Sequence, residues 1–95
     1  MKKHSESYYW NARDRIWRRL AELPQGTIKE RLISGRTYFY FQRREGKKVI
    51  HTYIGKEVPA DLKKKMRERE ALRAELAEIQ DVMRGILTGK IRNIL

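Results

Sequence analysis

Two short glycine turns, Ser34-Gly35 and Glu45-Gly46, most constrain what this chain can fold into. They separate three runs of residues rich in aromatic and β-branched side chains, between residues 28 and 54. Turns of this composition between such runs are typical of successive β-hairpins. The sequence therefore predicts a three-stranded antiparallel meander over residues 27–55.

The strand register decides which side chains share a face. If both turns are two-residue loops, Ile33 pairs with Arg36 and Arg44 pairs with Lys47, and paired residues point to the same side. Both registers then sort the side chains in the same way. The face expected to form the core collects Ile28, Leu32, Thr37, Phe39, Phe41, Ile50, Thr52 and Ile54, with Glu30 falling there against the pattern. The opposite face collects Lys29, Arg31, Arg36, Tyr38, Tyr40, Gln42, Arg44, Lys47, His51 and Tyr53, together with Ile33 and Val49.

The second set, here called the basic-aromatic face, has the composition of a nucleic-acid-binding surface. Its tyrosines can stack on bases or sugars, its arginines and lysines can hold phosphates, and Gln42 or His51 can read base edges. The chain has 23 Lys and Arg against 12 Asp and Glu, a net charge of +11 that favours a polyanionic partner. The alternative interpretation is that cross-strand Tyr and Arg pairs simply stabilise an exposed sheet.

A short helix is expected before the sheet, from about Ala12 to Glu22, with Asn11 as its N-cap and Pro24 ending it. Its arginines form a secondary basic patch, which is either a solvated helix face or a second phosphate contact. The patch consists of Arg13, Arg15, Arg18 and Arg19.

A long helix is expected after Pro59, over about residues 60–84 or beyond. Apolar residues recur along it at steps of three or four, namely Leu62, Met66, Leu72, Leu76, Ile79 and Met83. We expect this helix to pack on the apolar face of the sheet and to extend past it, because 25 residues span roughly 37 Å. The apolar residues in its second half must then be buried against the first helix, a homodimer partner or a larger protein. The same holds for the apolar tail residues Ile86, Leu87, Ile91, Ile94 and Leu95.

The expected fold is α+β within a single domain over residues 1–95. It comprises an N-terminal arm and helix (1–24), the meander (27–55), and the C-terminal helix with its tail (60–95). The chain has no cysteine and no apolar run near the ~18 residues of a membrane span. We therefore expect a cytoplasmic protein, or one of the host cytoplasm if phage-encoded, without a membrane partner. No nucleophile with a base and no metal-ligand spacing is evident, so we expect neither an enzyme nor a cofactor or metal.

Four stretches resemble a small module of bacteria, archaea and their phages that occurs beside transposase and other mobile-element sequences. They are Leu23-Pro24-Gln25-Gly26-Thr27-Ile28, Gly35-Arg36-Thr37-Tyr38-Phe39-Tyr40, Arg44-Glu45-Gly46-Lys47-Lys48-Val49 and Tyr53-Ile54-Gly55-Lys56. The resemblance covers about residues 23–80 and implies a role with mobile DNA. The order of three strands and a helix is also similar in topology to the amino-terminal DNA-binding domain of tyrosine-type phage integrases.

These observations predict a nucleic-acid-binding regulator or accessory subunit of prokaryotic or phage origin. The residues leave DNA and RNA open, and the resemblance favours DNA. The alternative is a protein-interaction module, such as a phage inhibitor or a small subunit of a larger nucleoprotein complex.

Overall fold

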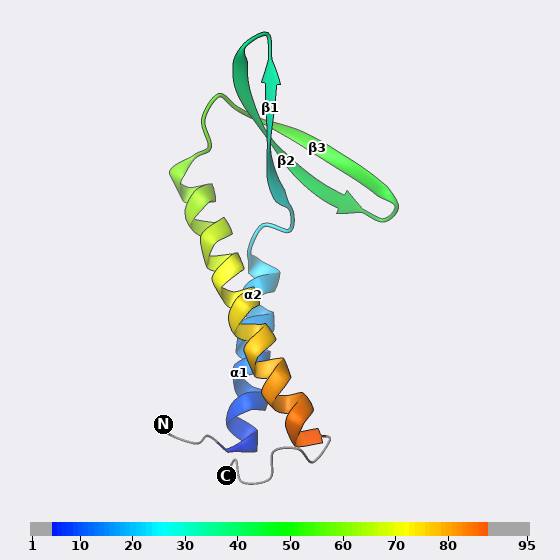
Figure 1. The fold of residues 1–95 in the computed structure, drawn as a ribbon, viewed down its shortest axis with the longest axis vertical. Helices are drawn as coiled ribbons and strands as arrows, with labels where there is room; N and C mark the ends of the chain where they lie inside the picture. Colours follow the sequence, from blue (N-terminus) through cyan, green and yellow to red (C-terminus); the bar gives the residue numbers. More distant parts are fainter. Residues whose placement is uncertain (1–4, 88–95) are drawn as a thin grey trace. The chain divides into compact units, whose positions relative to one another are not determined.

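The computed structural model describes residues 5–87. Two helices and three strands follow one another as α1 (Glu6–Glu22), β1 (Thr27–Ile33), β2 (Arg36–Glu45), β3 (Lys48–Gly55) and α2 (Ala60–Leu87) (Figure 1). The predicted α+β fold is confirmed. Contacts divide the chain into two compact units, one formed by residues up to Leu23 and from Arg67 onward, the other by Pro24–Met66.

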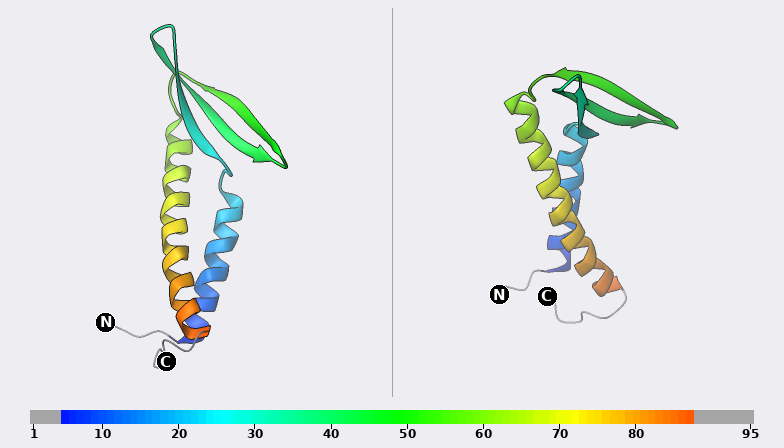
Figure 2. Two further views of the ribbon diagram at one scale, coloured as in Figure 1. Left: turned by 45° about the vertical axis from the view of Figure 1, so that its right-hand side comes forward. Right: turned by 45° about the horizontal axis from the view of Figure 1, so that its top comes forward.

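The buried core of the helical unit lies between α1 and the second half of α2, which run side by side (Figure 2). Residues three or four positions apart form one stripe on each helix. The six buried residues of this cluster are Ala12, Ile16, Leu20, Leu76, Ile79 and Met83. Of the surfaces expected to cover the far half of the long helix, α1 therefore provides the cover. In the first half, Leu62 and Met66 are half-buried.

Helix α1 begins at Glu6, six residues before the predicted start at about Ala12. Its N-cap is Ser5, whose Oγ accepts a hydrogen bond from the Tyr8 backbone N–H at 3.3 Å. The prediction of Asn11 as N-cap is wrong because Tyr9 and Trp10 pack against the helical core, and such tertiary contacts extend a helix beyond its local signals.

The sheet has the strand order β1-β2-β3, with both neighbouring pairs antiparallel. The predicted first register is confirmed, since Ile33 pairs with Arg36. The loop residues Ser34 and Gly35 have φ values of 51° and 77°, as a type I′ turn requires at both positions.

The predicted register of the second hairpin is wrong by two residues. Glu45 pairs with Lys48, so the loop consists of Gly46 and Lys47. Gly46 has φ 62° at the first loop position, where type II′ turns favour glycine, whereas the prediction placed it second. A shift of two residues preserves the alternation of faces, and the predicted segregation of side chains therefore survives.

Strand β3 carries a bulge near its end. Tyr40 pairs with Tyr53 but Phe39 pairs with Gly55, which leaves Ile54 as the extra residue. Strand β1 pairs with residues 36–42 of β2 and β3 pairs with residues 39–45, so only residues 39–42 are flanked on both sides. The three-stranded part of the sheet is therefore short, and each hairpin extends beyond it.

The face of the sheet that was expected to form the core contains no buried residue, so that prediction is wrong. None of the described strand residues is buried, and Leu32 is 74% exposed. Phe39, Phe41 and Ile50 are half-buried. The exposure of Glu30 on this face is consistent with the lack of a closed core there.

Within residues 5–87, neither helix combines the length and the apolar character that crossing a membrane requires. The predictions for the tail residues Ile91, Ile94 and Leu95 lie outside the described residues.

Candidate nucleic-acid interface

The registers place the strand residues predicted for the basic-aromatic face on one side of the sheet. Lys29 pairs with Tyr40, which pairs in turn with Tyr53, so these three side chains form a row across all three strands. Gln42 similarly pairs with Thr27 on one side and with His51 on the other. Paired residues share a face, so these residues lie on one side of the sheet, as the alternation of side chains in the sequence predicts.

Five side chains on this face contact one another and are here called the aromatic cluster: Arg31, Tyr38, Tyr40, His51 and Tyr53. The ring centroid of Tyr53 lies 5.4 Å from that of Tyr40 at an interplanar angle of 63°, and 6.3 Å from that of Tyr38 at 46°. The Arg31 guanidinium carbon lies 5.0 Å from the centre of the Tyr40 ring. These contacts place the rings at angles to one another, so the cluster presents both ring edges and ring faces.

His51 is held by Arg31 on this face. The Arg31 Nη2 atom and His51 Nδ1 are 2.9 Å apart. A guanidinium can only donate, so Nδ1 is the acceptor and the imidazole carries its proton on Nε2. The Nε2–H group of His51 is then the donor that this side chain can offer to a ligand.

The remaining basic residues lie toward the two ends of the face. Arg36 follows the first turn, and Arg44 pairs with Val49 near the second. Lys47 was predicted on a strand but lies in the second turn itself. Along β2 alone, five residues of this face alternate over roughly 27 Å from Arg36 to Arg44. They are Arg36, Tyr38, Tyr40, Gln42 and Arg44.

This face carries no acidic residue within the three strands. Glu30 and Glu45 belong to the opposite face, where Glu45 forms an ion pair of 3.2 Å with Arg43. In the described part of the chain, no carboxylate pairs with Lys29, Arg36 or Arg44. Within residues 5–87, the positive charges of these three residues are therefore not neutralised by an ion pair.

An open pocket of about 340 Å³ lies where β1 begins, next to Gln42 and Arg44. Thr27 and Gln25 also line it, although neither was predicted as a site residue. Thr27 could have been found from the sequence because the predicted register pairs it with Gln42 on this face. Gln25 precedes the strand, and no periodicity of the sequence indicates where its side chain lies.

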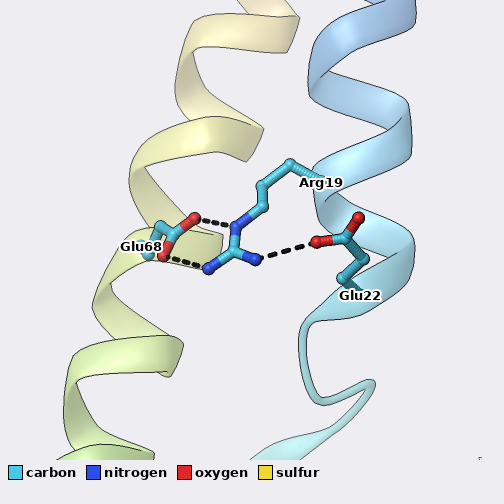
Figure 3. A network of polar contacts seen from close by, with 3 residues as sticks. All are labelled: Arg19, Glu22 and Glu68. Atoms are coloured by element: carbon cyan, nitrogen blue, oxygen red, sulfur yellow. Dashed lines mark hydrogen bonds and ion pairs between the residues drawn. The ribbon is translucent and has the colours of Figure 1, made fainter.

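The secondary basic patch predicted on the first helix is divided by its partners. Arg19 donates through Nε and Nη2 to both carboxylate oxygens of Glu68 on α2, and through Nη1 to Glu22 at 2.9 Å (Figure 3). These hydrogen bonds, chiefly those that Arg19 donates to Glu68 and then the one to Glu22, raise the pKa of Arg19. Arg19 therefore links the two helices.

The other three arginines of the patch have different surroundings. The guanidinium of Arg13 lies 4.7 Å from the Trp10 ring centre and 3.7 Å from a carboxylate oxygen of Asp14. Arg15 and Arg18 border a second open pocket of about 320 Å³. Asp14 also lines that pocket, which makes it less favourable for a phosphate than the face of the sheet.

No curated protein sequence and no solved structure matches this chain. A family model described as a domain of unknown function, DUF6788, matches residues 9–64. The match runs from the first half of α1 through the whole sheet into the start of α2. Because it covers more than half of the chain, the protein belongs to the DUF6788 family.

Proposed function

We propose that this protein binds nucleic acid through the basic-aromatic face of its sheet, as a regulator or accessory subunit in a prokaryotic or phage setting. One observation carries the proposal. Basic, aromatic and amide side chains occupy every second position of β2, on a face to which none of the three strands contributes a carboxylate. The residue types are those that contact phosphates, sugars and bases. The setting rests on the resemblance of the hairpin motifs to the mobile-element module.

The layout of the face suggests how a strand of nucleic acid would lie on it. Arg36 and Arg44 stand at the two ends of the row on β2, and Lys29 lies beside its centre. These three residues would contact phosphates. The aromatic cluster between them would contact sugars and bases, with the half-exposed Tyr53 as its most accessible ring.

The test compares two double variants that remove the same charge from opposite faces of the sheet. Lys29→Ala with Arg44→Ala acts on the basic-aromatic face, and Arg43→Ala with Lys48→Ala is the matched control. Fluorescence anisotropy titrations with labelled 12-nucleotide strands and 12-base-pair duplexes are carried out at several salt concentrations.

We expect the first double variant to weaken binding and to reduce the slope of log affinity against log salt by about 2, since each lost phosphate contact reduces it by about 1. The control variant should keep the wild-type slope. Equal effects of the two double variants would show that net charge alone drives binding, and the assignment to this face would be wrong.

A second candidate function, docking on a larger protein, is favoured by the apolar residues at the tip of the first hairpin. Leu32 is 74% exposed and Ile33 is 46% exposed. Salt-insensitive binding to a purified protein partner that is lost in Leu32→Ser, with no measurable affinity for either nucleic acid, would support this candidate instead.

A further inference from the structure

We infer that the pocket beside Gln42 receives one unpaired nucleobase, which makes single-stranded nucleic acid the ligand class of this face. The inference rests on the proposed function and specifies its ligand. It is carried by the lining, the shape and the position of the pocket.

The lining offers the chemistry that a nucleotide requires. The carboxamide of Gln42 and the hydroxyl of Thr27 can each donate and accept hydrogen bonds, as the edge of a base demands. Arg44 supplies a positive charge and Val49 an apolar contact. A carboxamide can bind an adenine edge through two hydrogen bonds, and a guanidinium can hold a phosphate. Among the described residues that line the pocket, none is acidic.

Arg43 also borders this pocket, but its Nη1 is engaged with Glu45 at 3.2 Å. Arg44 is the neighbouring cation whose strand position directs it to the basic-aromatic face. The phosphate-binding role within the pocket therefore falls to Arg44.

The shape of the pocket selects for an unpaired base. Its volume of about 340 Å³ is near the lower end of the range for small-molecule sites, which is ~300–1,000 Å³. Bases within a duplex are stacked and paired, and they present only their edges in the grooves. A base that enters a concave site must first leave the stack, which costs least when the strand is already single.

The position of the pocket connects it with the aromatic cluster. The Thr27–Gln42 pair lies two residues along the strands from the Lys29–Tyr40 pair, a separation of ~7 Å. A strand that contacts Tyr40 can therefore place a neighbouring base in the pocket. Gln42 is fixed for this role because it is paired with β1 on one side and with β3 on the other.

The backbone before β1 also shapes this end of the sheet. A Cβ atom on Gly26 would lie 2.5 Å from the carbonyl oxygen of Gln42 and 2.5 Å from the Phe41 ring. Only glycine allows the chain to approach β2 this closely. This close approach brings Gln25 and Thr27 to the same pocket as Gln42.

Two substitutions that preserve shape test the inference. Gln42→Leu removes the carboxamide and Thr27→Val removes the hydroxyl. Thr52→Val is the matched control, since Thr52 pairs with Phe41 on the opposite face of the same sheet. Each variant is first compared with the wild type by thermal denaturation, and Thr27→Val provides the result if Gln42→Leu fails to fold.

The ligands are labelled 12-nucleotide strands of dA, dC or dT, a 12-nucleotide abasic strand and a 12-base-pair duplex, measured by fluorescence anisotropy. We expect the wild type to bind at least one base-bearing strand more tightly than the abasic strand and the duplex. Gln42→Leu should reduce that affinity by about 5-fold or more, the lower limit for losing a two-bond contact to a base. Its affinity for the abasic strand, its salt slope and all properties of Thr52→Val should remain as in the wild type.

Wild-type affinities in both Gln42→Leu and Thr27→Val would overturn the assignment of a base to this pocket. An equal loss of affinity for the abasic strand would overturn it as well. A wild type that prefers the duplex would overturn it too. In these cases the proposed function still stands if Lys29→Ala with Arg44→Ala weakens binding. A wild type that binds none of the five ligands overturns both.

Discussion

Arg31 on β1 reaches across the central strand to His51 on β3, where the two side chains meet at 2.9 Å. The same guanidinium lies over the ring of Tyr40 on β2. Arg31 thus contacts side chains on both other strands of the sheet. It was predicted only as a ligand contact, and the structure gives it a supporting role as well.

Arg31→Ala should therefore lower the stability of the sheet as well as the affinity for a polyanion. The loss of one hydrogen bond and one exposed cation–π contact costs about 1 kcal/mol. Hydrogen–deuterium exchange of the strand amides measures the change. Arg36→Ala is the control, because Arg36 has no ion pair in the described part of the chain and should affect binding alone. Equal stability of the two variants would contradict the role given to Arg31.

Gly26→Ala should destabilise the sheet by about 1–3 kcal/mol, because the new methyl group would overlap the Gln42 carbonyl oxygen and the Phe41 ring. Part of this overlap involves a side chain that can be removed. In the Phe41→Ala background, Gly26→Ala should therefore cost less than in the wild type. A double-mutant cycle from urea denaturation measures the difference. Additive effects would mean that the backbone contact alone is responsible.

Replacing an aromatic residue of the sheet should cost less than emptying the helical core. Phe39 is half-buried, so Phe39→Ala should fall below the ~3–5 kcal/mol of a buried phenylalanine. Ile16 is 4% exposed between the helices, and Ile16→Ala should cost about 2–5 kcal/mol. Separate probes, tryptophan fluorescence for the helices and hydrogen–deuterium exchange of the strand amides for the sheet, show which unit each variant affects. A larger loss for Phe39→Ala would indicate that the apolar face of the sheet is covered in solution.

Arg19→Lys should lower the melting temperature even though it preserves the charge. A lysine ammonium cannot form the two parallel hydrogen bonds that Arg19 makes with Glu68, nor add the bond to Glu22 from the same planar group. Arg18→Lys on the same helix is the control and should leave the melting temperature unchanged. Circular dichroism at 222 nm measures both. Because its raised pKa lies above the ordinary value for arginine, Arg19 stays charged as pH varies around neutrality, and its contribution should not change there.

The alternation of residues along the strands determined much of the candidate site before any tertiary contact was known. The turn at Ser34-Gly35 fixed the first register, and the period of two assigned Tyr38, Tyr40 and Gln42 to one face. The error in the predicted register of the second hairpin did not change this assignment, because a shift of two residues leaves every side chain on the same face. The helical stripes around Ile16 and Ile79 were equally evident from their spacing.

Tertiary structure alone decided which surfaces are buried and which charges are engaged. An apolar stripe predicts that its side chains are buried but does not indicate which segment packs against them. The buried core formed between the two helices rather than beneath Phe39 and Phe41. Likewise, the sequence gives Arg19 the same chemistry as Arg15, but only Arg19 lies opposite a carboxylate 49 residues away. Local periodicity fixes the direction in which a side chain leaves the backbone, whereas its partner depends on contacts between segments distant in the chain.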